Sequence, residues 1–183
     1  VGAGAGATVG KILGGTRAMK GGVGSAALRL NSGLVVGAIA TVNAAGSVVD
    51  PATGRVVAGV RSADGTKLED VRGIVRGERL AQSPLPENTT VVIVATNAKL
   101  TKAQANFVAK MAQAGLARAV LPVFTLADGD TVFVLATGRW DGAVDVSAIG
   151  ALAAEAVGDA ILRGVRAASG IPGFPAARDM QPR

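Results

Sequence analysis

A threonine at the start of a hydrophobic run has surroundings that suggest chemistry. Asn88-Thr89-Thr90 follows a polar, proline-containing segment and opens the run TTVVIVATNA. A threonine at such a junction can attack its own preceding carbonyl in an N-to-O acyl shift, and hydrolysis of the resulting ester would expose Thr89 as a new N-terminus. Its α-amine, with an ordinary pKa of about 7.7–8.0, can then act as a general base near neutral pH. The structural alternative is that the Asn-Thr pair only begins a strand.

Missing residue types narrow the chemistry further. The 183 residues include no His, no Cys and no Tyr. Ser-His-Asp and Cys-His arrangements therefore cannot be assembled from this sequence, and nearly every zinc ligand set is excluded. A catalytic base would have to be a carboxylate, a lysine or an α-amine, and we expect neither a metal nor an organic cofactor.

Three further positions carry polar groups that allow a structural and a chemical interpretation. Lys11 stands alone among small apolar residues, so it is either a surface lysine or a desolvated ammonium that pairs with a carboxylate or tunes a reactive group. Asn43 ends a hydrophobic run, where its amide either forms a turn or donates to an oxyanion. Asp128 and Asp130 flank Gly129 in a tight turn, and two carboxylates so close can share a proton or orient an ammonium.

Composition argues against several function classes. The net charge is +6, but the nineteen Lys and Arg residues are spread along the chain, and four Phe and one Trp offer little for base stacking, so we expect no nucleic-acid partner. Leu30–Val49 is uncharged but interrupted by polar residues and glycine, which disfavours a membrane span. Residues 2–7 satisfy a G-x-G-x-x-G/A pattern, but no strand precedes them and no helix-forming run follows, which disfavours nucleotide binding.

The first half of the chain has the pattern of loops and strands. Residues 1–33 are glycine-rich and predict a loop followed by a short glycine-laden strand. LVVGAIATVN and RVVAGV predict a hairpin or meander, because the connection between them contains Asp-Pro and Thr-Gly turn pairs. From Arg61 to Asn88 the chain is polar and predicts an exposed loop and a processing site.

The second half alternates strands with helices. TTVVIVATNA is rich in β-branched residues and predicts a strand buried on both faces. Thr101 to Gln104 matches a capping box, and hydrophobic residues recur at helical spacing until Gly115. Residues 119–125 and TVFVLAT predict strands, residues 146–168 predict a long helix, and residues 169–183 predict a loose tail. Helices that flank strands in this order favour an α+β fold of layered type in one domain.

Five blocks in the same order resemble one known family. They are GAGAGATVGK, MKGGVGSAALRL, VGAIATVNAAGSVVDPATG, ENTTVVIVATNAKLTKAQ and DGDTVFVLATG. Together they resemble the N-terminal-nucleophile family of L-aminopeptidase/D-esterases, which includes β-peptidyl aminopeptidases and nylon-oligomer hydrolases. The resemblance implies an αββα sandwich and a precursor that cleaves itself into a larger α chain and a smaller β chain.

Carried over to this sequence, the resemblance implies roles for five residues. The cleaved bond would be Asn88–Thr89 and Thr89 the nucleophile, Asn43 would match the oxyanion-hole asparagine, and Lys11 would match an active-site lysine of the nylon-hydrolase branch. Asp128 and Asp130 would match the pair that assists the nucleophile. The aminopeptidase branch has Ser as nucleophile and Ser and Glu as that pair, so the resemblance leans towards nylon hydrolases.

These expectations define the whole-chain hypothesis. Residues 1–88 would be the C-terminal part of the α chain and residues 89–183 the β chain, and we expect further residues upstream because the chain opens on Val1. The function implied is an amide or peptide hydrolase that acts on small peptides or amides. We expect a homo-oligomer, a tetramer by resemblance. We also expect a cytoplasmic location and no membrane partner. The alternatives are an acyltransferase of the ornithine acetyltransferase type and an inactive truncated relative.

Overall fold

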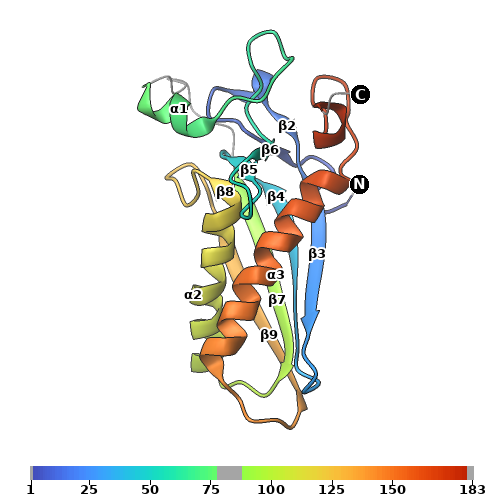
Figure 1. Cartoon of the computed structure of the whole chain (residues 1–183), viewed down its shortest axis with the longest axis vertical. Coiled ribbons are helices and arrows are strands. Elements are labelled where there is room, and N and C mark those ends of the chain that lie inside the picture. Colours follow the sequence, from blue (N-terminus) through green and yellow to red (C-terminus); the bar gives the residue numbers. More distant parts are fainter. Residues whose placement is uncertain (1, 78–87, 181–183) are drawn as a thin grey trace.

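A computed structural model describes residues 2–77 and 88–180 of the chain (Figure 1). Its strands are β1 (Thr8–Val9), β2 (Met19–Lys20), β3 (Gly22–Arg29), β4 (Val35–Asn43), β5 (Ser47–Val49), β6 (Val56–Ala58), β7 (Thr89–Ala98), β8 (Val120–Leu121) and β9 (Thr131–Trp140). Its helices are α1 (Val71–Arg76), α2 (Lys102–Ala119) and α3 (Val146–Ala167), with short 3-10 turns η1 (Gly15–Arg17) and η2 (Ala177–Met180). The α+β class expected from the sequence is confirmed.

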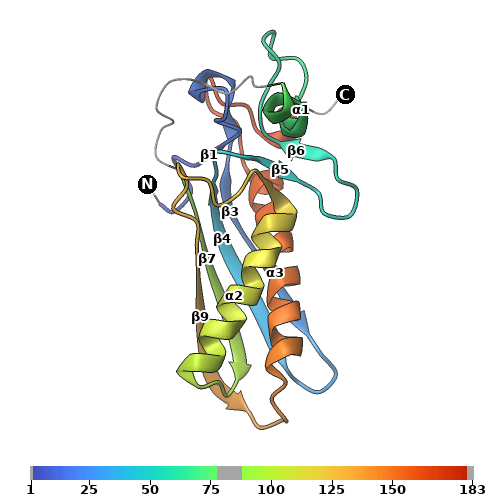
Figure 2. The same ribbon diagram turned by 90° about the vertical axis from the view of Figure 1, so that its left-hand side faces the viewer.

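A four-stranded sheet in the order β3-β4-β7-β9 forms the long axis of the molecule. β4 is antiparallel to both β3 and β7, whereas β9 is parallel to β7. Helices α2 and α3 lie side by side along one face of this sheet (Figures 1 and 2). The parallel β7–β9 pair is connected through α2 and β8, as a crossover between parallel strands requires.

The helices form where the sequence provides caps and an apolar face. Thr101 and Gln104 form the expected capping box at the start of α2, and Asp145 caps α3 by accepting from two backbone N–H groups. α2 continues beyond the expected end at Gly115. This glycine is buried where α2 crosses α3, since a Cβ there would lie 2.2 Å from the carbonyl oxygen of Ala154.

The opposite face of the sheet leaves large hydrophobic side chains exposed. Burial alternates along β7, so the expectation that this strand is buried on both faces is wrong for the chain described. Small or branched apolar residues pack under the helices, and every second residue points away from them. The exposed members are Val23, Ile39, Val91, Ile93, Phe133 and Leu135.

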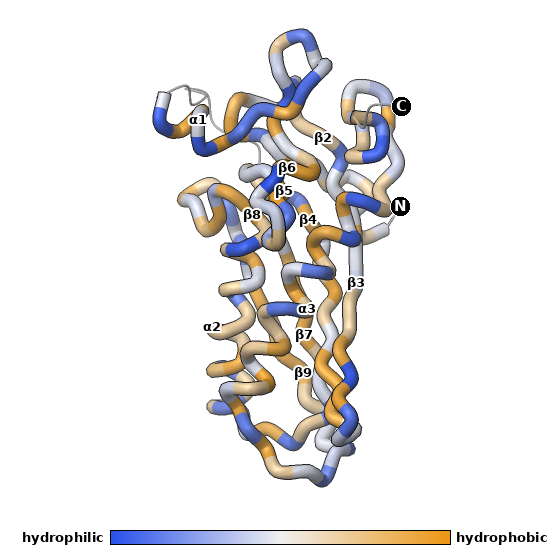
Figure 3. Tube along the Cα trace, viewed as in Figure 1, coloured by the Kyte–Doolittle hydropathy of each residue, from blue (hydrophilic) through white to orange (hydrophobic). Residues whose placement is uncertain are grey.

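Short elements gather at one end of the long sheet, the upper end in Figure 1. β5 pairs with β6 and β8, and β1 pairs with β2. The hairpin or meander expected from LVVGAIATVN and RVVAGV is therefore wrong. The first run forms β4 in the long sheet, whereas β6 of the second run pairs with β5, which lies between them in the sequence. Figure 3 shows hydrophilic residues in the loops of this end, hydrophilic and apolar ones together in α1, and mainly apolar ones along the strands of the long sheet.

Two segments differ from the loops expected of them. Residues 71–76 form α1, whose Val71 and Ile74 pack in a small second cluster with Ile12 and Val60. Residues 61–70 form turns with one isolated bridge between Arg61 and Leu68, and residues 78–87 of the expected loop lie outside the described residues.

The expected loose tail is packed as far as residue 180. Ala176 is fully buried, the carbonyl of Pro175 accepts from the N–H of Lys20, and Arg178 donates to the carbonyl of Ala167 at the end of α3. These contacts hold residues 175–178 against the body of the chain.

Candidate active site

The strand register brings two of the sequence-predicted residues together. Asn43 is the last residue of β4 and Thr89 the first of β7, and the two are directly paired across the antiparallel ladder. Asn88 forms an isolated parallel bridge with Asp128, just before β9. The ends of three adjacent strands therefore place Asn43, Thr89 and the Asp128–Asp130 turn at the same end of the sheet.

Lys11 joins this cluster from the glycine-rich N-terminal segment. Its Nζ donates to Asn43 Oδ1 at 2.9 Å and to the Asn43 carbonyl at 3.3 Å. Asn43 Oδ1 also accepts from the backbone N–H of Thr8 at 3.0 Å. Two donors on one oxygen fix the orientation of the amide, because only the oxygen of Asn43 can accept both.

The Lys11 side chain is buried, at 3% exposure, which contradicts the surface-lysine interpretation. Burial lowers the pKa of Lys11 to about 8, and the negative charge of Asp128 limits the fall. With this pKa, Lys11 is mostly protonated at neutral pH and loses its proton in mildly alkaline solution. It thereby supplies positive charge to the Asn43 amide.

The two carboxylates of the turn accept hydrogen bonds from the backbone. Asp128 Oδ1 accepts from the N–H of Ala45 at 3.0 Å, which links the turn to the segment after β4. Asp130 Oδ1 accepts from the N–H of Thr90 at 2.7 Å, and its Oδ2 accepts from the N–H of Phe124 at 3.2 Å. Burial raises the pKa of Asp130, and these backbone N–H groups oppose the rise. The two side chains therefore help to fix the backbone around Thr89 by binding N–H groups of neighbouring segments.

Thr89 is placed against the carbonyl that it would attack. Its hydroxyl donates to the carbonyl oxygen of Asn88, and the same oxygen accepts from the N–H of Gly129 at 2.9 Å. Asn88 is buried at 3% exposure, and its Nδ2 donates to the carbonyl of Ala127 at 3.2 Å. The turn at residues 127–129 therefore contacts both the carbonyl and the side chain of Asn88, next to the bond between residues 88 and 89.

Sequence reasoning missed the backbone donors of this site. The sequence indicates Gly129 only as the centre of a turn and gives Thr8 no special place. No side-chain pattern marks either residue, since both act through their N–H groups. The one signal in the sequence is that Gly129 lies between the two predicted carboxylates. The structure adds that a side chain at residue 129 would collide with Thr89.

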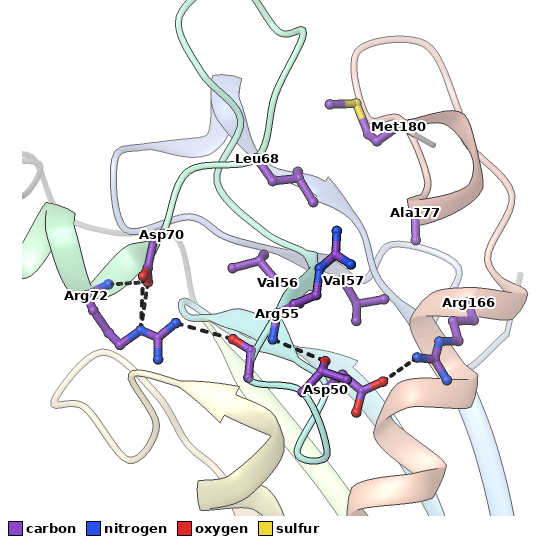
Figure 4. A pocket seen from close by; sticks show the side chains of 12 residues that line it. Asp50, Arg55, Val56, Val57, Leu68, Asp70, Arg72, Arg166, Ala177 and Met180 are labelled. Atoms are coloured by element: carbon purple, nitrogen blue, oxygen red, sulfur yellow. Dashed lines mark hydrogen bonds and ion pairs between the residues drawn. The ribbon is translucent and has the colours of Figure 1, made fainter. Parts of the chain in front are cut away.

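A cavity of about 760 Å³ lies apart from these residues, between β6, the residues before α1 and the C-terminal turn η2 (Figure 4). Arg166 pairs with Asp50 at 2.8 Å and Arg72 with Asp70 at 2.9 Å on its wall. None of the predicted site residues lines it. Within residues 2–77 and 88–180, no group of three or more acidic side chains is arranged to hold a metal ion.

Comparison with known proteins agrees with the resemblance drawn from the sequence. The family model of peptidase family S58 matches residues 1–178. The chain belongs to peptidase family S58. An uncharacterized aminopeptidase of Mycobacterium tuberculosis is 39% identical over 90% of this chain and 53% of its own length. A 6-aminohexanoate-oligomer endohydrolase of Paenarthrobacter ureafaciens is 31% identical over 77% of this chain and 43% of its own.

Solved structures show the same fold. A beta-aminopeptidase of Burkholderia sp. superposes with a TM-score of 0.51 at 29% identity, over 86% of this S58 chain and 46% of its own. The L-aminopeptidase D-Ala-esterase/amidase of Ochrobactrum anthropi, described as a variant of the Ntn hydrolase fold, gives a TM-score of 0.53 at 19% identity, over 92% of this chain and 50% of its own. The S58 chain thus has an Ntn-hydrolase-type fold and spans about half the length of the relatives it matches.

No helix in the described part of the S58 chain combines the length and apolar character needed to cross a membrane.

Proposed function

We propose that the protein carrying this S58 chain cleaves itself between Asn88 and Thr89 and then hydrolyses amide bonds through an acyl-enzyme on Thr89. The observation that supports this most directly is the Thr89 hydroxyl lying against the Asn88 carbonyl at the start of a central strand. A hydroxyl already in contact with its target carbonyl needs little rearrangement to react.

In the cleaved protein the free amine of Thr89 would take the hydroxyl proton as Oγ1 attacks a substrate carbonyl. The same amine would return the proton to the leaving amine, and water would then hydrolyse the acyl-enzyme. The Asn43 amide would donate to the developing oxyanion, worth a few kcal/mol of barrier, about the effect of one oxyanion-hole donor. Lys11 supports this role because its Nζ binds Asn43 Oδ1 and so orients the amide.

Asp128 and Asp130 would position the nucleophile rather than exchange protons with substrate. Each carboxylate binds backbone N–H groups of segments that border Thr89. Their negative charge would also stabilise the Thr89 ammonium that forms when the amine takes the hydroxyl proton. No step in this scheme calls for a metal or an organic cofactor.

The substrates we propose are small peptides or amides. The names of the relatives, aminopeptidase and 6-aminohexanoate-oligomer endohydrolase, support an amide bond in both cases. Assembly of α and β chains into a homo-oligomer, and into a tetramer in particular, remains a proposal, as does a cytoplasmic location. The acyltransferase alternative is not favoured, because the family and the named relatives are peptidases and amide hydrolases.

The experiment that tests the proposal is intact-mass analysis of the purified complete protein. The wild type should yield two fragments divided after Asn88, and Thr89→Ala should remain a single chain. Thr89→Ser should still divide, because it keeps the hydroxyl. A Thr89→Ala protein that divides after residue 88 would show that another group is the nucleophile, and an undivided wild type would favour an inactive relative.

A further inference from the structure

The scissile carbonyl already has a backbone donor in the uncleaved chain. The N–H of Gly129 donates to the Asn88 oxygen at 2.9 Å, on the same oxygen that the Thr89 hydroxyl contacts. When Oγ1 adds to this carbonyl, the oxygen takes up the negative charge of a tetrahedral intermediate. A fixed donor on that oxygen binds the charged intermediate more strongly than the neutral carbonyl, which lowers the barrier.

The turn that carries this N–H is fixed on both sides. Asp128, before Gly129, accepts from the N–H of Ala45, and Asp130, after it, accepts from the N–H groups of Thr90 and Phe124. These contacts tie the turn to the residues after β4, to β7 and to its own preceding loop. The Gly129 N–H therefore needs no reorganisation when charge develops, which is the condition for a strong electrostatic effect.

Glycine at position 129 is needed for this approach. A Cβ built there would lie 2.9 Å from Thr89 Oγ1, a distance that real Cβ contacts essentially never show. A side chain would push the turn away from the carbonyl or displace the nucleophile. Glycine therefore lets the turn place its N–H on the Asn88 oxygen while Thr89 Oγ1 stays where it is.

We propose that the N–H of Gly129 is the oxyanion donor of the self-cleavage step, an inference that rests on the proposed function. The Thr89 Oγ1–Asn88 carbon bond forms and the Asn88–Thr89 carbon–nitrogen bond breaks. The hydroxyl proton ends on the Thr89 nitrogen, which becomes the amine. Water then adds to the ester, giving the Asn88 carboxylic acid and restoring the Thr89 hydroxyl.

Removing only this N–H tests the inference. In the complete protein, glycolic acid in place of Gly129 changes the amide between residues 128 and 129 to an ester and adds no side chain. The first-order rate of self-cleavage, followed by intact mass, should fall about 100- to 1,000-fold, as when one oxyanion donor is lost. The matched control is the same change at Gly65, whose N–H donates to the Ser62 carbonyl at 2.9 Å in a turn, and it should leave the rate unchanged.

Two results would overturn the inference without affecting the proposed nucleophile. One is an ester at position 129 that cleaves at the wild-type rate while Thr89→Ala stays intact. The other is rapid hydrogen exchange of the Gly129 amide in uncleaved Thr89→Ala, measured by NMR, which also decides the matter if the ester protein does not fold. Division of Thr89→Ala would instead reject the proposed function itself.

Discussion

Lys11 is buried, and its Nζ donates to two oxygen atoms of Asn43. Because burial lowers its pKa, the stability of the fold should depend on pH. Its pKa is about 8 in the folded chain and 10.5 for an ordinary lysine. Between these values the unfolded chain binds more protons than the folded chain. The free energy of unfolding contributed by Lys11 should therefore rise with pH over this interval.

Urea unfolding at about pH 7.5 and about pH 9.5 measures this effect. All proteins in this comparison carry Thr89→Ala, so that the chain stays uncleaved. The increase in unfolding free energy from the lower to the higher pH should be smaller when Lys11→Met is added than when Lys11 is kept. Lys67→Met, which removes an exposed lysine, should keep the wild-type increase. An equal increase in all three proteins would mean that Lys11 titrates as an exposed lysine does.

Lys20 is a second buried lysine, at 6% exposure, and it acts on Asn43 through one peptide group. Its Nζ donates to the carbonyls of Gly4 at 2.9 Å and Ala7 at 2.8 Å. The peptide of that Ala7 carbonyl carries the Thr8 N–H, which donates to Asn43 Oδ1. Lys20 thus holds the donor that orients the proposed oxyanion group.

Lys20→Met should lower kcat about tenfold or more and change KM little, because misplacing a catalytic group acts on the transition state. Steady-state kinetics on an amide substrate of the cleaved protein measures both constants, with Lys67→Met as the control. A variant that loses stability but keeps kcat would assign Lys20 a purely structural role.

Side chains of the candidate site could be predicted from the sequence, but their partners could not. Thr89, Asn43, Lys11 and the two aspartates were suggested by residue type and by the family resemblance. That Asn43 lies opposite Thr89 follows from strand register, which depends on long-range pairing. The donor from Gly129 is a backbone group, and every residue except proline has one.

At the scale of elements, the α2–α3 crossing depends on Gly115. A Cβ at this position would lie 2.2 Å from the Ala154 oxygen and 2.8 Å from the Val157 Cβ. Alanine in a helix is about 1 kcal/mol more favourable than glycine, whereas overpacking costs about 1–3 kcal/mol. Because the closest atom belongs to the backbone, we expect the overpacking to prevail.

Gly115→Ala should therefore lower the unfolding free energy by about 1–3 kcal/mol, measured by denaturant unfolding. Gly73→Ala in α1, where an added Cβ meets nothing within 4 Å, should be neutral or stabilising. If both substitutions stabilise the protein, the helices are not in the close contact described.

The elements that were predicted well have strong local signals. The capping box begins α2 as expected, and the apolar face of α3 follows its helical periodicity. β7 was assigned correctly as a strand, but its unbroken β-branched sequence hides the alternation of burial. α1 has no clear signal in the sequence because its six residues, VRGIVR, are too few to show a helical period.

At the scale of the whole molecule, the sequence predicted the α+β class but could not show how many layers this chain supplies. The described residues form one helical layer and one long sheet, in a chain that spans about half of its relatives. The apolar side chains on the uncovered sheet face, Ile93 and Phe133 among them, suit a second sheet.

The order of strands in the long sheet has a consequence for recovery from denaturation. The fragment ending at Asn88 contributes β3 and β4, and the fragment starting at Thr89 contributes β7 and β9, so the proposed cleavage divides the sheet along its centre. Once unfolded, the cleaved protein must bring two separate molecules together to rebuild the β4–β7 ladder. Its refolding rate should fall in proportion to dilution, while uncleaved Thr89→Ala should refold at a rate independent of concentration. Self-cleavage would thus give the enzyme its nucleophile and turn a unimolecular folding reaction into a bimolecular one.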